Sequence, residues 1–215
     1  MLGPLSLIIA YLLGAVPFGY LLVKFTKGED VREAGSGNIG ATNVLRTTGP
    51  GMGVATLLLD AAKGFVAVWI ASMLTGAAPE WTSLAALAVM AGHAFPVFLG
   101  FKGGKAVASF TGAFAYLTPL PLAAVAILFV LIVAVTKHIS AGSILGAAAF
   151  PFGVWIILHP PLQITLAAFL AGAFVVYRHQ SNWQRLRAGT ENVFHWGGER
   201  GFASDEHMLR RWRGK

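Results

Sequence analysis

Cysteine is absent from the 215-residue chain. Its absence excludes disulfides, thiolate metal ligands and any mechanism that carries an acyl group on a cysteine. Charged residues are also scarce, at 12% of the chain, whereas 56% of the chain is hydrophobic. Soluble domains carry about 25% charged residues, so the composition excludes an ordinary soluble domain. The few charges fall in clusters, which indicates polar loops between apolar segments.

The first apolar run, residues 4–23, contains no charged residue. A helix needs roughly 20 apolar residues to cross about 30 Å of hydrocarbon, so this run predicts a membrane span. A cleaved signal peptide would need basic residues before a shorter apolar core, and no Lys or Arg precedes Lys24. We therefore expect this span in the mature protein. Further apolar segments lie at about 52–75, 82–100, 107–118, 120–136, 140–158 and 162–177.

The basic residues indicate how these segments are oriented. The segment at 107–118 is short for a span, but if it crosses, all basic connections fall on one side and all connections without Lys or Arg on the other. The positive-inside rule then predicts an all-α bundle of seven transmembrane helices, with the N-terminus outside and the C-terminus cytoplasmic. We expect one membrane domain, residues 1–191, and a basic cytoplasmic tail, residues 192–215. The net charge of +7 fits such loops beside anionic lipid, and no nucleic-acid-binding module is present.

Three polar clusters, residues 35–46, 92–109 and 177–191, share the predicted cytoplasmic side. Glycine amides, hydroxyls, carboxamides and cations together predict a phosphate site. The candidate ligands in the first two clusters are Gly35, Ser36, Gly37, Asn38, Thr42, Asn43, Arg46, Lys102, Gly103, Gly104 and Lys105. For any one cluster alone, turns and ordinary positive-inside cations are the better interpretation. The convergence of three clusters favours a site.

Charged residues and histidines also occur in or beside the predicted spans. Asp60 and Lys63 are three residues apart inside the second segment, so they should share a helix face that points to the protein interior. A structural ion pair and a direct role of Lys63 in substrate binding are equally consistent with this position. His93 and His179 lie at predicted cytoplasmic helix ends, and His179 shares a face with Asn182 if its helix continues. We favour His179 as the catalytic histidine and place His93 among the substrate-binding candidates.

Several familiar catalytic motifs are missing. No two histidines have the spacing of zinc ligands. The sequence GFKGGKA is not a Walker A loop, since its glycine spacing differs and Ala106 stands where Ser or Thr would hold magnesium. No histidine is followed five positions later by an acidic residue, and Ser36 lacks the G-x-S-x-G elbow of hydrolases. A metal site, nucleotide hydrolysis and a covalent serine intermediate are therefore disfavoured.

Together the clusters resemble one family, the bacterial acyl-phosphate:glycerol-3-phosphate acyltransferases (the PlsY family). The resemblance covers about residues 4–191 and rests on GSGNIGATNVLR (35–46), LDAAKG (59–64), GHAFPVFLGFKGGK (92–105), YRHQSNWQRL (177–186) and GTE (189–191). It implies a seven-helix inner-membrane enzyme that moves a fatty acyl group from acyl phosphate to the sn-1 hydroxyl of glycerol 3-phosphate. The products would be lysophosphatidic acid and phosphate, and the active site would face the cytoplasm.

The resemblance also implies roles for individual residues. It makes Ser36, Arg46, His179 and Asn182 the catalytic candidates, residues 100–105 a phosphate-binding loop, and Glu191 a structural residue. Neither a metal nor a cofactor is implied; membrane lipid surrounds the protein, and a soluble acyl-phosphate-forming enzyme is a candidate partner. In one departure, Ala106 replaces the family's usual glycine; because a methyl group restricts the backbone, we expect no positive φ there.

The expected mechanism follows from two anionic substrates. Arg46, Lys63, Lys102 and Lys105 would balance the two phosphates, and either His179 or a substrate phosphate would take the proton. The acyl chain would lie in a hydrophobic groove, for which Phe95, Phe98, Phe101 and Phe110 are candidates. The alternative function is a small organic-phosphate or anion transporter, in which Asp60 and Lys63 would gate a path. The short outer loops lack cations that would attract an anion, which argues against it.

Overall fold

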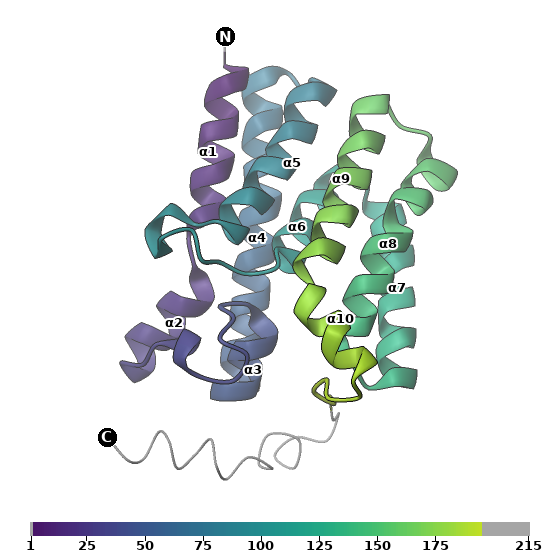
Figure 1. The fold of residues 1–215 in the computed structure, drawn as a ribbon. Coiled ribbons are helices and arrows are strands. Elements are labelled where there is room, and N and C mark those ends of the chain that lie inside the picture. The colour runs from purple at the N-terminus through teal and green to yellow at the C-terminus, as the bar shows by residue number, and fades with distance from the viewer. Residues whose placement is uncertain (1, 195–215) are drawn as a thin grey trace.

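The computed structural model describes residues 2–194, and every regular element within them is a helix. The elements are α1 (Gly3–Ala15), α2 (Phe18–Lys27), η1 (Val31–Glu33), α3 (Ala41–Thr48), α4 (Pro50–Thr75), α5 (Pro79–Ala94), η2 (Val97–Leu99), α6 (Val107–Leu117), α7 (Pro119–Thr136), α8 (Ile139–Leu158), α9 (Leu162–Arg178) and α10 (Gln180–Arg187). Figure 1 shows a helical bundle in which α1 begins at one end and α2, α3 and α10 lie toward the other. The predicted all-α class is confirmed.

Five segments are long and apolar enough to cross a membrane: Gly3–Lys27, Pro50–Thr75, Pro79–Leu99, Pro119–Thr136 and Ile139–Leu158. Helices α9 and α10, bent by 55° relative to each other, make a sixth if they count as one span. The expected fourth span corresponds to α6, whose 11 residues extend only about 16 Å. The structure of residues 2–194 thus supports five or six crossings by length, and the seventh crossing and the orientation stay predictions.

The glycine loop of the second polar cluster lies within the bundle. The connection from α5 to α6 crosses the bundle about halfway between its ends (Figure 1). Helix α5 ends at Ala94, and η2 and an extended stretch lead from there to the start of α6. The short α6 therefore follows from a loop that enters the interior, where its backbone groups must find partners inside the protein.

Close helix contacts in the N-terminal part of the bundle depend on glycine. A Cβ atom on Gly14 of α1 would lie 2.1 Å from the Val89 carbonyl oxygen of α5. Between α4 and α6, a Cβ on Gly112 would lie 1.8 Å from the Ala61 carbonyl oxygen. Residues without a side chain let backbones approach closely, which is how helices associate in lipid without a hydrophobic driving force.

Two helix breaks shape the interior. Pro17 separates α1 from α2, and the Val16 carbonyl near this break accepts a hydrogen bond from Lys63 Nζ at 2.8 Å. The same ammonium lies 2.7 Å from Asp60 Oδ1, and both side chains are buried. Asp60 and Lys63 therefore form the interior ion pair that their spacing predicted. The second break lies at His179, between α9 and α10, so the helix that leads to His179 does not continue unbroken to Asn182.

Candidate functional site

A cavity of about 370 Å³ opens among the polar clusters. One wall comes from the first cluster and includes Ser36, Asn38, Thr42, Asn43 and Arg46. The opposite polar wall carries Lys105, Ser140, His179, Asn182, Arg185 and Glu191, from the second and third clusters and α8. Residues that are far apart in the chain, such as Ser36 and His179, thus line one space.

The first cluster folds around the carboxamide of Asn43. Its Oδ1 accepts hydrogen bonds from the Ser36 backbone N–H at 2.8 Å and from the Ser36 hydroxyl at 3.1 Å. Its Nδ2 donates to the carbonyls of Val31, Ala34 and Asn38. Asn43 is buried, and a Cβ on Gly35, which has φ +59°, would lie 2.3 Å from its Oδ1. Asn43 thus organises the loop, although the sequence pattern predicted a substrate ligand at this position.

Arg46 is a cation of this wall whose side chain has no bonding partner within residues 2–194. It makes no hydrogen bond or ion pair with any of these residues, although it lines the cavity. By contrast, Arg185 on the opposite wall donates through Nε to Glu191 Oε2 at 2.7 Å. A guanidinium with five free N–H groups in a partly closed space is suited to an anionic ligand.

In the second cluster, Lys105 is the residue that reaches the cavity. Its ammonium donates a short hydrogen bond to Asn182 Oδ1. Burial, reinforced by the positive charges of Arg185 and Arg46, lowers the pKa of Lys105 to about 8. Lys102 is exposed and, like Gly103 and Gly104, is not part of the cavity lining. An incoming phosphate would favour the protonated form of Lys105.

Ala106 corrects an expectation from the sequence. Its backbone has φ 61° and ψ 13°, in the left-handed region, although we expected no positive φ at a residue with a methyl side chain. The alanine is fully buried and serves as N-cap of α6. A left-handed alanine costs roughly 1–2 kcal/mol, which the surrounding packing must offset. A loop that seats Lys105 and then turns directly into α6 requires this conformation.

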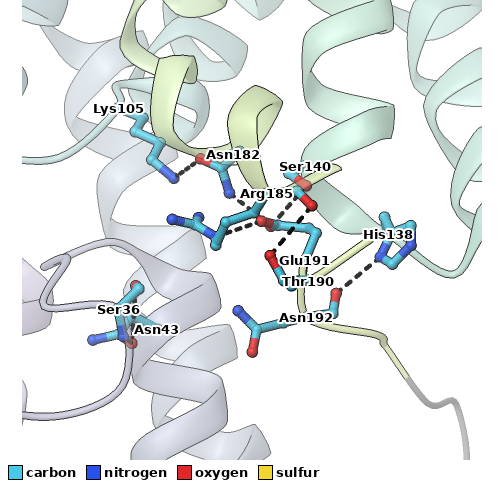
Figure 2. A network of polar contacts seen from close by, with 10 residues as sticks. All are labelled: Ser36, Asn43, Lys105, His138, Ser140, Asn182, Arg185, Thr190, Glu191 and Asn192. Carbon is cyan, nitrogen blue, oxygen red and sulfur yellow. Dashed lines mark hydrogen bonds and ion pairs between the residues drawn. The ribbon is translucent and has the colours of Figure 1, made fainter. Parts of the chain in front are cut away.

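The third cluster is held by the carboxylate of Glu191. Its Oε1 accepts from Ser140 Oγ at 2.9 Å and from Asn182 Nδ2 at 2.7 Å, while Arg185 binds Oε2 (Figure 2). Burial opposes ionisation of Glu191, but these three hydrogen bonds outweigh it and keep its pKa below the usual range. Since Asn182 also bonds Lys105, the network links the second and third clusters.

His179 has a defined tautomer. Its Nδ1 lies 2.7 Å from the Val175 carbonyl oxygen, and because a carbonyl can only accept, Nδ1 carries a proton. In the neutral ring Nε2 therefore offers a lone pair. His93 is also buried: its Nδ1 lies 3.7 Å from Asp60 Oδ1, and both residues reach the cavity lining. Lys63, expected in the cationic wall, is not part of that lining.

The apolar part of the cavity differs from the expected phenylalanine groove. Phe110 packs in the core against Phe114 and Phe150, and Phe95 stacks with Phe174 and Arg178. None of the four candidate phenylalanines, which include the exposed Phe98 and Phe101, lines the cavity. The apolar lining consists of Leu45, Val54, Leu57, Val107, Phe129, Val130, Val133, Ile139, Val193 and Phe194, with the alanines beside them.

Residues 192–194 lie at the cavity as well. The Asn192 carbonyl pairs with His138 Nδ1 at 3.1 Å, and the Phe194 N–H donates to the Lys137 carbonyl at 2.6 Å. The first residues of the expected tail thus belong to the site, while residues 195–215 lie outside the described part of the chain. Within residues 2–194, no group of three His, Cys, Asp or Glu could hold a metal ion.

Two arginines of the third cluster, Arg178 and Arg185, were not among the sequence candidates. Arg185 lines the cavity, and Arg178 donates to the carbonyls of Gly103 and Gly104. Both belong to YRHQSNWQRL, so the available signal was the motif itself. The sequence could not indicate their partners, because Arg178 and Gly104 are 74 positions apart.

Comparisons with known proteins point to one family. The profile of the family described as glycerol-3-phosphate acyltransferase matches residues 4–189. The glycerol-3-phosphate acyltransferase of Geobacter sulfurreducens is 46% identical over 186 residues, which cover 86% of this chain and 94% of that protein. The enzyme of the same name from Trichlorobacter lovleyi is 48% identical over 187 residues, with the same two coverages.

Two solved structures of PlsY (YgiH), an integral membrane glycerol 3-phosphate acyltransferase, share the fold. The glycerol 3-phosphate form matches with a TM-score of 0.85 and 34% identity, over 91% of this chain and 96% of that one. The lysophosphatidic acid form matches with a TM-score of 0.82 and 32% identity, over the same coverages. The resemblance drawn from the polar clusters is confirmed. The chain is a multi-pass membrane enzyme that belongs to the glycerol-3-phosphate acyltransferase family.

Proposed function

We propose that this enzyme transfers a fatty acyl group from acyl phosphate to the sn-1 hydroxyl of glycerol 3-phosphate, giving lysophosphatidic acid and phosphate. The acceptor is supported by the family and by solved relatives described as glycerol 3-phosphate and lysophosphatidic acid forms. The observation that carries the proposal is the cavity itself, whose lining combines cations and hydroxyls with a set of apolar side chains. Cations and hydroxyls are suited to phosphate, and the apolar side chains are suited to an alkyl chain.

Two substrate phosphates need cations that are not already paired with a carboxylate, as Arg185 is with Glu191. Arg46 has no ion-pair partner within residues 2–194 and is the first candidate to bind phosphate. Lys105 is the second candidate, because its Asn182 partner is neutral. Ser36, Thr42 and the first turn of α3 add hydroxyl and backbone donors on the same wall. In this scheme Asn43 and the glycines shape the loop, and Lys63 and Lys102 hold no substrate.

The chemistry needs positioning more than acid catalysis, because the phosphate of an acyl phosphate is a stable leaving group. The sn-1 oxygen attacks the acyl carbonyl carbon, the bond between that carbon and the phosphate oxygen breaks, and a phosphate accepts the hydroxyl proton. Nε2 of His179 offers a lone pair that can receive a hydrogen bond from the attacking hydroxyl. Asn182 and Lys105 then hold the phosphate or the developing oxyanion.

The acyl chain is assigned to the apolar wall formed by α4 and α7. Val54 and Leu57 of α4 and Val130 and Val133 of α7 line the cavity there, and α7 is otherwise mostly exposed, as expected for a helix in lipid. Each buried CH₂ contributes about 0.8 kcal/mol, so a long chain supplies much of the binding free energy. A substrate with such a chain explains why the catalyst resides in the membrane.

We further propose that the enzyme lies in the inner membrane with its N-terminus outside, its C-terminus inside and the cavity open to the cytoplasm. The alternation of basic and uncharged connections supports this orientation. A soluble enzyme that forms acyl phosphate would then deliver its product from the cytoplasm. Since the chain has no cysteine, single replacements such as Glu80→Cys and Lys27→Cys test it with a membrane-impermeant maleimide. Labelling of the Lys27 site from outside intact cells would overturn the orientation.

The function is tested with purified protein in detergent. Acyl phosphate plus glycerol 3-phosphate should release one phosphate per lysophosphatidic acid formed, without added metal or nucleotide. Positional analysis of the product should place the acyl group at sn-1. Product from acyl-CoA but not from acyl phosphate would refute the proposed donor. His179→Ala should slow single turnover, and a full rate in that variant would remove His179 from the mechanism.

A further inference from the structure

Arg178 lies immediately before His179 but faces away from the cavity, toward the glycine loop of the second cluster. Its Nη2 donates to the Gly104 carbonyl at 2.8 Å and to the Gly103 carbonyl at 3.2 Å, and its Nε donates to Gly104 at 3.2 Å. The guanidinium also stacks on the ring of Phe95, with its carbon 5.1 Å from the ring centroid. A planar fork held by stacking on one side fixes two neighbouring carbonyls in orientation.

The other edge of the same loop is held by α5. The N–H of Gly103 donates to the Ala94 carbonyl, and the N–H of Gly104 donates to the His93 carbonyl, both at 3.1 Å. A Cβ on Gly104 would lie 2.2 Å from His93 Nε2, so the loop lies directly against that ring. Both glycine residues are thus held twice, by α5 through their N–H groups and by Arg178 through their carbonyls.

These hydrogen bonds fix the backbone position from which the Lys105 side chain extends. Lys105 follows Gly104 directly, lines the cavity and donates to Asn182, while Arg178 itself does not line the cavity. The segment that carries His179 and Asn182 therefore also holds the loop that carries Lys105. We propose that Arg178 is a positioning residue for acyl transfer, which sets Lys105 against His179 and Asn182 through the carbonyls of Gly103 and Gly104. The inference rests on the proposed function, in which Lys105 binds a substrate phosphate.

The matched control is Arg187, nine residues further along. Its guanidinium carbon lies 5.0 Å from the ring centroid of Trp183, so it is also a stacked arginine. Its side chain has no hydrogen bond or ion pair within the described residues and does not line the cavity. Replacing either arginine with glutamine removes one positive charge and one aromatic contact, but of the two only Arg178 touches the glycine loop.

The test compares Arg178→Lys and Arg178→Gln with Arg187→Lys and Arg187→Gln in detergent. We expect Arg178→Gln to weaken glycerol 3-phosphate binding about tenfold by calorimetry and to lower kcat about 100-fold. Arg178→Lys keeps the charge but loses the fork, so it should lose about tenfold in kcat. Both Arg187 variants should stay within about twofold of the parent.

A variant that is partly misfolded and a variant in which Lys105 is displaced give different kinetic and binding results. A partly unfolded sample lowers the apparent kcat but leaves the dissociation constant and KM of the folded fraction unchanged, so unchanged values in Arg178→Gln would overturn the inference. Phe95→Leu removes the ring that lies against Arg178, together with its edge contact to Phe174, and leaves the hydrogen bonds of Arg178 in place. It should raise KM as well, and an unchanged KM in this variant also counts against the inference. Calorimetry needs no acyl donor, so it tests Arg178 even if acyl phosphate proves not to be the donor.

Discussion

Replacing Glu191 with alanine should both destabilise the protein and slow acyl transfer, because one carboxylate holds three donors. Ser140 and Asn182 donate to its Oε1 at 2.9 and 2.7 Å, and Arg185 donates to its Oε2 at 2.7 Å. Asn182 is only 5% exposed, so water cannot easily take the place of the lost oxygen. The alanine variant therefore leaves buried donors without an acceptor.

The magnitude follows from those donors. An orphaned buried donor costs about 1–3 kcal/mol, and the change creates two, on Ser140 and Asn182. The side chain of Arg185 is 34% exposed and regains water, so its lost ion pair adds about 1 kcal/mol or less. We expect the free energy of unfolding to fall by about 3–4 kcal/mol. Since Asn182 also bonds Lys105, a shift of about 1 Å there should lower kcat about 100-fold.

Stability is measured by unfolding in mixed SDS micelles, and activity by single-turnover acyl transfer. The control is Glu80→Ala, because Glu80 is an exposed carboxylate in the first turn of α5, away from the cavity. Glu191→Gln should fall between, since its amide oxygen still accepts from Asn182 but its nitrogen faces Arg185. If Glu191→Ala unfolded with the same free energy as Glu80→Ala and reacted within twofold of the parent, the reasoning would be refuted.

Three further predictions concern the loop and the helix contacts. Because burial and neighbouring cations lower the pKa of Lys105 to about 8, kcat/KM for glycerol 3-phosphate should decline as pH rises through that value. Lys105→Arg should move the decline to higher pH, and an unchanged profile would contradict the assignment. Ala106→Gly should change the free energy of unfolding by less than about 1 kcal/mol, because relief of the left-handed strain offsets the greater backbone entropy of glycine in the unfolded chain. Ala106→Val should unfold readily, and equal stability of the two variants would count against a strained backbone at this position. Gly112→Ala should destabilise by about 1–3 kcal/mol, because its Cβ would lie 1.8 Å from a carbonyl oxygen of α4. Gly51→Ala, which meets nothing within 4 Å, is its neutral control in the same unfolding assay.

Local sequence patterns were sufficient to find the helices and the polar clusters. Apolar runs near 20 residues predict spans, and basic connections predict which loops share a side, so the sequence indicated that Ser36 and His179 would come together. Both do line one cavity in the structure. The short segment at 107–118 could not be resolved in this way, since hydropathy does not show that a loop enters the bundle before it.

Pairings between distant residues were beyond such patterns. Asn43 has a polar side chain that could bind a ligand, but its carboxamide makes hydrogen bonds to backbone groups of its own loop. Ala106 adopts a positive φ because tertiary packing overrides the preference of a single residue. The phenylalanines near the second cluster were reasonable groove residues by hydrophobicity alone. Half of the larger apolar residues of the lining come instead from α4 and α7, whose contact with the site depends on the assembled bundle.

Charged side chains at the helix breaks follow one physical rule. Backbone that leaves the helix inside a membrane protein exposes carbonyls that lipid cannot satisfy. At the break after α1, Lys63 donates to the Val16 carbonyl, and in the glycine loop Arg178 donates to Gly104. A buried cation in a span can therefore bind substrate or donate a hydrogen bond to a carbonyl at a helix break. The spacing of the residue in the sequence does not distinguish these two roles. The irregular backbone brings polar groups to the cavity, so we expect the cations that bond to its carbonyls to affect catalysis without touching the substrate.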